Sequence, residues 1–530
     1  MQTMTIETIR KHCPSCCRFL DKKLPEPAAG SFSEIPDSNN LPDFFASLAE
    51  KSVVPPFVAD LCRLELALKG VGETDFDLTP PADGFQINPS LTVLELSWQG
   101  LPDLILPKDG VPEEGRQVVM VWKKSGQDEP CCKVATDEDL LVLKLVLENI
   151  SPADAALAGG LPIGAIDLAI AGGVESETVL SPPSAIKRGD GFFPEGCLAE
   201  KEKYSTIDAF TLQWHLTQAC DLHCRHCYDR SRRDTLDLEQ GIAVLDDFRE
   251  FCRNRHVDGQ VSFSGGNPLL YPYFKDLYRA AADRGLAIGI LGNPAKKEIL
   301  EELIGIQHPA FFQVSLEGLA EHNDYIRGEG HFERIMAFLE ILKELGIYSM
   351  VMLTLTRDNQ EQVIPLGEML KGRVDSFTFN RLAMVGEGAS LYSCDPDGFR
   401  DFLARYQGAA MKNPVMRLKD NLFNLLRMEE GKKPIGGCTG YGCGAAFNFI
   451  TLLPDGEVHA CRKLPSLVGN ILEQSLGEIF DSEAAERYRQ GSRSCDGCRI
   501  RPVCGGCQAV GYGFGLDIGK DRDPYCFLKE

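Results

Sequence analysis

The sequence predicts an α/β protein whose centre is a partial, TIM-like (βα)6 barrel, preceded by an α+β domain and followed by a cysteine-rich domain. Three observations lead to this prediction. Over residues 204–410, six short apolar runs alternate with amphipathic helical patterns, which is typical of a parallel sheet covered by helices. Residues 1–200 lack this alternation, and residues 411–530 hold eight of the twenty cysteines. A chain of 530 residues is also too long for one hydrophobic core.

The first 200 residues are predicted to form an α+β domain with a winged-helix-like arrangement. A helical pattern comes first, two strand-like runs follow, and a second helical pattern leads into an alanine-rich run. In order, these segments cover residues 41–69, 91–97, 117–122 and 137–147. The polar, proline-containing residues 181–188 are predicted to be a linker. We interpret the domain as a binding module.

The six predicted barrel strands are short and apolar. They cover residues 210–216, 260–264, 287–291, 311–316, 348–355 and 376–379. The helical patterns between them include residues 238–251, 273–282, 332–345 and 361–370. Because ligands of such folds bind at the carboxyl ends of the strands, we expect the functional site in the loops that follow them.

Three closely spaced cysteines follow the first predicted strand. Cys220, Cys224 and Cys227 are separated by three and then two residues, so that one loop can wrap around one cluster. Three thiolates hold three corners of a cubane [4Fe-4S] cluster and leave the fourth iron open as a reaction site. Zinc spacing more often comes as two CxxC pairs. A chance grouping is the alternative, and the strand before the motif and the helix after it argue against it.

The motif resembles the C-x3-C-x2-C loop of radical S-adenosylmethionine (SAM) enzymes. The resemblance implies that the amine and carboxylate of SAM chelate the open iron. One electron from the cluster then cleaves SAM, and the resulting 5'-deoxyadenosyl radical abstracts a hydrogen atom from the substrate. The resemblance also implies that His226, directly before the third cysteine, lies beside the adenine of SAM.

The loop after the second strand carries a further motif similar to one of this family. Gly265, Gly266 and Asn267, followed by a proline, resemble its Gly-Gly-Glu-Pro loop, which contacts the amino group of SAM. Here asparagine replaces the charged glutamate. Two glycines let the backbone approach a ligand closely, and a plain turn is the alternative.

The third and fourth strands end on motifs that resemble other SAM contacts. Asn293 lies in an asparagine-bearing loop, Ser315 matches a residue that contacts the ribose, and Arg327 matches one that binds the methionine carboxylate. An arginine fork suits a carboxylate. Glu317 stands where the family usually has aspartate, and we predict that it is a solvated acid without a catalytic role.

A second group of cysteines surrounds a predicted hairpin at residues 449–461. Eight thiols are enough for two fully ligated cubanes. The eight cysteines are Cys438, Cys443, Cys461, Cys495, Cys498, Cys504, Cys507 and Cys526. Their pattern resembles the SPASM extension of radical SAM peptide maturases, although the last CxxC gap is usually three residues there. The resemblance implies two auxiliary [4Fe-4S] clusters, one on Cys438, Cys443, Cys461 and Cys507 and the other on Cys495, Cys498, Cys504 and Cys526. Spacing equally allows the sequential sets, and two zinc sites are a further alternative.

The other cysteines carry no such motif. Cys13, Cys16 and Cys17 could combine with Cys131 and Cys132 in a small metal site, although ordinary reduced thiols are the commoner case. The remaining four are predicted to be structural, namely Cys62, Cys197, Cys252 and Cys394.

Together the two resemblances imply an enzyme that modifies a ribosomally made precursor peptide with SAM and three [4Fe-4S] clusters. An electron donor, a flavodoxin or a ferredoxin, belongs to this prediction. The loops at Gly266 and Asn293 are most similar to those of selenobiotic-type peptide maturases, and the N-terminal domain is then expected to hold the precursor. One alternative oxidises a cysteine or serine of a protein, like an anaerobic sulfatase maturase. The other is an iron-sulfur electron carrier or regulator without SAM chemistry.

Composition narrows the partners and the location. The net charge of -22 argues against nucleic acid, which needs clustered lysine and arginine. The most membrane-like stretch, residues 155–174, contains proline, aspartate and many small residues, so no membrane partner is expected. No signal peptide is evident, and twenty cysteines without one predict a reducing, cytoplasmic location.

Overall fold

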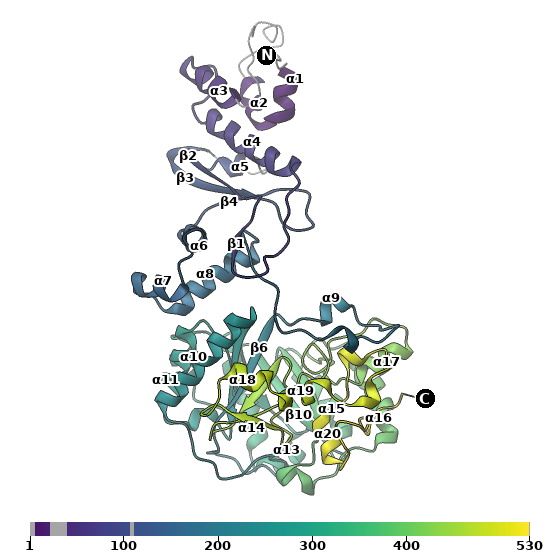
Figure 1. Cartoon of the computed structure of the whole chain (residues 1–530). Helices are drawn as coiled ribbons and strands as arrows, with labels where there is room; N and C mark the ends of the chain where they lie inside the picture. Colours follow the sequence, from purple (N-terminus) through teal and green to yellow (C-terminus); the bar gives the residue numbers. More distant parts are fainter. Residues whose placement is uncertain (1–5, 22–39, 106–110, 529–530) are drawn as a thin grey trace. The chain divides into compact units, whose positions relative to one another are not determined.

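The structure is a computed structural model that describes residues 6–21, 40–105 and 111–528 (Figure 1). The chain divides into two compact units, residues 1–183 and residues 184–530. We describe each unit by itself.

Four helices open the described part of the first unit. α1 (Ile6–His12) and α2 (Pro14–Asp21) come before α3 (Leu41–Glu50) and α4 (Val58–Glu73). The helical segment predicted over residues 41–69 is therefore two helices. Two consecutive prolines separate them, and proline lacks the amide hydrogen that a helix interior needs. The four helices share one hydrophobic core with the sheet that follows.

That sheet is antiparallel and has the order β2-β3-β4. Its strands are β2 (Thr92–Gln99), β3 (Glu113–Trp122) and β4 (Cys131–Val134). α5 (Leu101–Ile105) follows β2. The two strands predicted from the apolar runs in this region are confirmed as β2 and β3.

Three more helices complete the first unit. They are α6 (Asp137–Glu148), α7 (Pro152–Gly159) and α8 (Ile163–Glu175), and the first two begin at side-chain caps. β5 (Val179–Leu180) then pairs with β1 (Gln86–Ile87). The predicted helix over residues 137–147 is confirmed. A helical part, an antiparallel strand pair and further helices follow one another in the predicted order, and the winged-helix assignment stays a prediction.

The second unit is built on one nine-stranded sheet with the order β11-β10-β9-β8-β7-β6-β12-β13-β14. Strands β6 to β11 are parallel to their neighbours, and all six predicted barrel strands are confirmed. Their bounds are β6 (Ala209–Thr217), β7 (Asp258–Gly265), β8 (Ala287–Leu291), β9 (Phe311–Ser315), β10 (Ser349–Leu355) and β11 (Ser376–Arg381). Their buried side chains form the core of the unit, as expected of parallel strands covered by helices.

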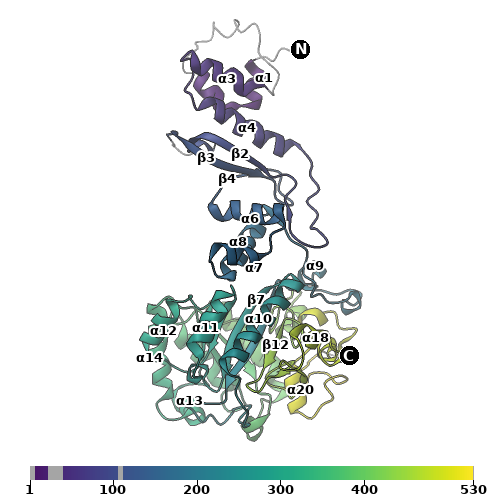
Figure 2. The same cartoon turned by 60° about the vertical axis from the view of Figure 1, so that its left-hand side comes forward.

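Helices connect the parallel strands, and Figure 2 shows α10 beside β7. α13 and α14 lie between β9 and β10 in the chain, so one connection holds two helices. The helices up to residue 410 are α9 (Lys201–Tyr204), α10 (Leu238–Arg255), α11 (Phe274–Asp283), α12 (Lys297–Ile304), α13 (Ala320–Arg327), α14 (His331–Glu344), α15 (Val363–Leu370) and α16 (Pro396–Ala410). The four predicted helices are confirmed as α10, α11, α14 and α15.

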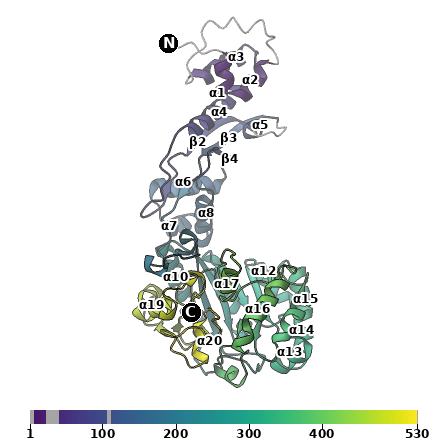
Figure 3. The ribbon, with the colours of Figure 1, turned by 90° about the vertical axis from the view of Figure 1, so that its right-hand side faces the viewer.

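The cysteine-rich part extends the barrel sheet instead of forming a sheet of its own. β12 (Phe449–Leu452) pairs in parallel with β6 and forms the predicted hairpin with β13 (Glu457–His459). β14 (Leu467–Asn470) is the edge strand. The helices of this part are α17 (Phe423–Glu429), α18 (Leu476–Asp481), α19 (Glu483–Gln490) and α20 (Gln508–Gly513), and Figure 3 shows α19 and α20 near the C-terminus. Over the part of the chain that the structure describes, none of the helices has the length and hydropathy needed to cross a membrane.

Candidate active site

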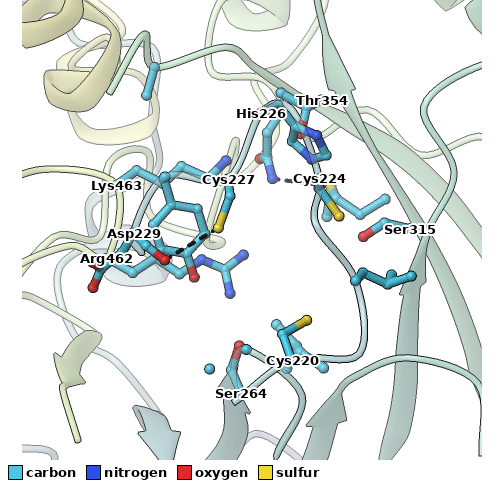
Figure 4. Close-up of a pocket in the computed structure, with 18 of the residues that line it drawn as sticks. Cys220, Cys224, His226, Cys227, Asp229, Ser264, Ser315, Thr354, Arg462 and Lys463 are labelled. Carbon is cyan, nitrogen blue, oxygen red and sulfur yellow. Dashed lines mark hydrogen bonds between the residues drawn. The ribbon is translucent and has the colours of Figure 1, made fainter. Parts of the chain in front are cut away.

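A cavity of about 280 Å³ lies at the carboxyl ends of the parallel strands, where the fold predicts a site. Cys220, Cys224 and Cys227 all line it. Figure 4 shows Cys224 and Cys227 on one side of this space and Cys220 beside Ser264 on another. Six of the seven residues predicted to contact SAM also line the cavity, namely His226, Gly265, Gly266, Asn293, Ser315 and Arg327.

Two of the three thiols face donors that suit sulfur in its thiolate form, whereas Cys227 Sγ donates to the carbonyl oxygen of Asp229 at 3.3 Å. The Asn293 amide donates to Cys220 Sγ at 3.6 Å, and Arg327 Nη1 donates to Cys224 Sγ at 3.7 Å. Burial raises the pKa of Cys224 and of Cys227, so these thiolates need a cation to bind them. Among the described residues, no three His, Cys, Asp or Glu side chains are already gathered at metal-binding distances, and this holds for the three-cysteine loop as well. The donor set and the cavity in front of it fit an iron-sulfur cluster.

The two glycines of the second loop are required by the backbone itself. Gly265 has φ +131°, and a Cβ there would lie 2.4 Å from the carbonyl oxygen of Thr217. A Cβ on Gly266 would lie 2.3 Å from the carbonyl oxygen of Ala219. The end of β7 therefore passes directly against the start of the three-cysteine loop, and any side chain would push the two segments apart.

Asn267, the seventh predicted SAM contact, does not line the cavity. It is buried, and its Nδ2 donates to Asp221 Oδ1 at 3.1 Å. Asn293 Nδ2 donates to the same oxygen at 2.6 Å. A glutamate in place of Asn267 would face the Asp221 carboxylate and repel it. Asparagine at position 267, in place of the family's usual glutamate, is therefore compatible with the Asp221 carboxylate. The sequence analysis missed Asp221, which lies inside the three-cysteine loop.

Glu317 is not the solvated acid that we predicted. Its side chain is 2% exposed, and Arg327 donates to its Oε1 from Nη2 at 2.6 Å and from Nε at 3.0 Å. The backbone amide of Thr354 donates to its Oε2 at 2.8 Å, and His226 Nε2 lies 3.3 Å from its Oε1. Burial alone would raise the pKa of Glu317, but His226 and Arg327 hold it well below its usual range. The carboxylate thus fixes the two predicted SAM contacts in place.

Two cations that the sequence analysis missed also line the cavity. Arg462 and Lys463 follow Cys461 in the chain and come from the cysteine-rich part (Figure 4). Burial, together with Arg462 and Lys419, lowers the pKa of Lys463 to about 8. In the sequence these two residues look like a solvated basic pair, and only their position after a predicted cluster ligand hints at more.

A second cavity, of about 210 Å³, lies next to the first. Four of the eight C-terminal cysteines line it, namely Cys438, Cys443, Cys461 and Cys507. The two cavities share five lining residues, which are Asn380, Arg381, Ala383, Arg462 and Lys463. The three-cysteine loop and this four-cysteine group therefore open onto neighbouring spaces that one wall separates.

The other four C-terminal cysteines lie near one another. Burial raises the pKa of Cys495 to about 11, and the thiols of Cys498 and Cys526 add to this rise. Burial also raises the pKa of Cys504, with Cys495 and Cys498 among its charged neighbours. The structure thus places Cys507 with an earlier group and not with Cys504, which precedes it by three residues. The assignment of these cysteines to two clusters stays a prediction.

Comparison with protein families identifies both domains. Residues 214–370 match the radical SAM superfamily, and residues 443–508 match the iron-sulfur cluster-binding domain known as SPASM. The chain therefore carries a radical SAM domain followed by a SPASM domain. Their cofactors are [4Fe-4S] clusters and SAM.

Individual relatives fall into two groups by their names. The AdoMet-dependent heme synthase of Methanosarcina barkeri is 28% identical over 349 residues, which are 60% of this chain and 96% of the relative. The mycofactocin maturase MftC of Mycolicibacterium smegmatis is 27% identical over 331 residues, which are 59% of this chain and 82% of the relative.

One solved structure shares the fold over a larger part of the chain. The crystal structure of Streptococcus suis SuiB bound to its precursor peptide SuiA aligns with a TM-score of 0.50 at 16% identity. The alignment covers 78% of this chain and 96% of SuiB. Residues 184–530 alone are a smaller share of the chain than this, so the likeness of fold includes part of the first unit.

Proposed function

We propose that this chain is a radical SAM enzyme that abstracts a hydrogen atom from a ribosomally made precursor peptide and thereby modifies it. The observation that carries the proposal is the shared wall between the three-cysteine cavity and the four-cysteine cavity. When bound, the cluster and SAM supply a 5'-deoxyadenosyl radical. A substrate in the first cavity would lie beside the second group of cysteines, where an auxiliary cluster could accept its electron.

The proposed cofactor set is one SAM-binding and two auxiliary [4Fe-4S] clusters. Cys220, Cys224 and Cys227 would hold the first cluster. The six predicted contacts that line the same cavity would bind SAM, namely His226, Gly265, Gly266, Asn293, Ser315 and Arg327. The two groups of four C-terminal cysteines described above would hold the auxiliary clusters. A flavodoxin or a ferredoxin would supply electrons, and the reduced thiols favour a cytoplasmic location.

A peptide substrate is favoured by the relatives and by the first unit. MftC is named a maturase, and SuiB was crystallised with a precursor peptide. The SuiB alignment includes part of the first unit of this chain. This favours a role of the first unit in binding a peptide. The selenobiotic-type subfamily rests on the loops at Gly266 and Asn293 and is the finer form of this proposal.

A tetrapyrrole is the second candidate substrate, because the heme synthase of M. barkeri matches over nearly its whole length. The test is anaerobic incubation with SAM and dithionite, with either a precursor peptide encoded beside the gene or an iron porphyrin. We expect the peptide to change mass and to raise 5'-deoxyadenosine at least about tenfold, since correct substrates assemble the catalytic site. The porphyrin should do neither. Stimulation by the porphyrin alone would select the second candidate, and no 5'-deoxyadenosine under any condition would contradict SAM chemistry.

The first unit offers two surfaces for an extended peptide. β4 pairs with β3 on one side and is the edge of the described sheet, so a peptide can add to it as a further strand. Large leucines are exposed on the helices that follow, including Leu147 and Leu168, which are 74% and 62% exposed. We propose that this unit captures the precursor.

Replacing Leu168 by aspartate is expected to weaken precursor binding about tenfold, the equivalent of roughly 1.4 kcal/mol for one apolar contact. Fluorescence titration of the full chain with labelled precursor measures this. Leu472, an exposed leucine of the second unit, provides the matched control, and Leu472→Asp should bind normally. Equal affinity of both variants and the parent chain would contradict a role of this helix in capture.

A further inference from the structure

Three buried thiols converge in the first unit where α2 meets α4. Cys13, between α1 and α2, places its Sγ 3.4 Å from Sγ of Cys62 on α4. Cys16 of α2 is a hydrogen-bond neighbour of both, and its thiol also reaches the carbonyl oxygen of Val58 at 3.6 Å. All three cysteines have no exposed surface.

A buried carboxylate completes this group. Glu65 follows Cys62 by three residues, so both side chains lie on the same face of α4. Its Oε1 accepts the amide of Ser15 at 2.7 Å, and its Oε2 accepts the amide of Cys16 at 3.1 Å. The residue is 6% exposed. A carboxylate held out of water beside three thiols is a site that a cation would stabilise.

We propose that Cys13, Cys16 and Cys62 bind one zinc ion, with the Glu65 carboxylate as fourth ligand. The CxxC spacing of the first two is that of structural zinc sites. In a tetrahedral site with Zn–S bonds of about 2.3 Å, the sulfurs lie about 3.8 Å apart, close to the distance between Cys13 and Cys62. A cubane holds its external sulfurs further apart, because its irons lie between them. The four side chains are not yet gathered at the distances of a single-ion site, so zinc binding must draw them together.

This ligand set differs from the group predicted from the sequence. Cys131 and Cys132 are adjacent in β4, so their side chains point to opposite faces of the sheet. Cys132 packs against the core that holds the N-terminal thiols, whereas Cys131 packs against another core. Cys62, which we predicted to be structural, lies beside the thiols of Cys13 and Cys16, where we expected Cys131 and Cys132. The ion would fasten the first two helices to α4, and this role does not depend on the proposed function.

The test is metal analysis of the full chain, purified without oxygen and without chelators. We expect about one zinc per chain by plasma mass spectrometry. Zinc K-edge absorption does not detect iron, and it should show three sulfurs at about 2.3 Å and one oxygen at about 2.0–2.2 Å. The spectrum of the unmutated chain keeps the test valid even if a cysteine variant fails to fold.

Two variants identify the ligands. Cys62→Ser should lower the zinc content at least about tenfold, while Cys132→Ser, which alters a partly buried thiol of the same core, should keep it. The proposal is overturned by a chain without zinc, by four sulfur ligands, by zinc retained in Cys62→Ser, or by zinc lost in Cys132→Ser. A Cys13–Cys62 disulfide in the anaerobic protein, detected by mass spectrometry, would overturn it too.

Discussion

Replacing Cys224 by alanine is expected to lower the formation of 5'-deoxyadenosine at least about 100-fold. The residue supplies one of three thiols that face the main cavity, and an open iron requires that the other three irons each keep a protein ligand. Mutating residues that only hydrogen-bond to metal ligands already lowers metal affinity or activity about 10–100-fold. Losing a ligand itself should lower product formation further. Anaerobic incubation with SAM and dithionite, followed by chromatography of the nucleosides, measures the product.

Cys252 provides the matched control for this experiment. It is buried in α10 within the core of the second unit and lies outside both cavities. Cys252→Ala should lose some stability through the small cavity that it creates and still form 5'-deoxyadenosine. Product formation by Cys224→Ala at the parent rate would contradict the role proposed for the three-cysteine loop. Equal loss in both variants would indicate a general folding defect instead.

The barrel and the cysteine motifs were predictable because their signals are local. Each parallel strand is a short apolar run, and each helix keeps its own period, so the six strands could be placed before their pairing was known. The ligand spacing of Cys220, Cys224 and Cys227 also lies within one loop. The grouping of Cys507 with distant cysteines, in contrast, was implied by family resemblance alone and not by spacing.

The environment of the cavity could not be predicted, because residues distant in the sequence create it. Glu317 appeared solvated, since nothing local shows that Arg327 returns to it through α13 or that the Thr354 amide meets it from β10. Arg462 and Lys463 reach the cavity only because β12 pairs with β6 and extends the barrel sheet. Long-range pairing of this kind leaves no period in the sequence.

A network of buried ion pairs around Arg381 also connects the barrel to the cysteine-rich part. Arg381 at the end of β11 donates from Nε to Asp420 at 2.7 Å, and from Nη1 and Nη2 to Asp523 at 2.7 and 2.8 Å. The side chains of all three residues are between 2% and 8% exposed. Asp523 also accepts the backbone amide of Cys507 at 2.7 Å. One buried arginine thus connects the barrel to a proposed ligand of an auxiliary cluster.

Replacing Arg381 by methionine is therefore expected to destabilise the second unit by about 3–5 kcal/mol, because two buried carboxylates lose the positive charge that pairs with them. Urea denaturation of the cluster-free chain, followed by circular dichroism, measures the change in the free energy of unfolding. Adding Asp420→Asn and Asp523→Asn should recover part of the loss, because neutral amides cost less to bury than unpaired charges.

An exposed arginine of the same unit provides a control that tests whether burial, and not ion pairing alone, causes the loss of stability. Arg405 makes two hydrogen bonds of 2.7 Å to Glu361, but their side chains are 50% and 71% exposed. Arg405→Met should change the free energy of unfolding by about 0–1 kcal/mol, since water solvates the carboxylate that it leaves. If both arginine variants lost the same stability, burial would not be the cause. A loss below about 1 kcal/mol in Arg381→Met would mean that the carboxylates find water, and that this network does not hold the barrel and the cysteine-rich part together.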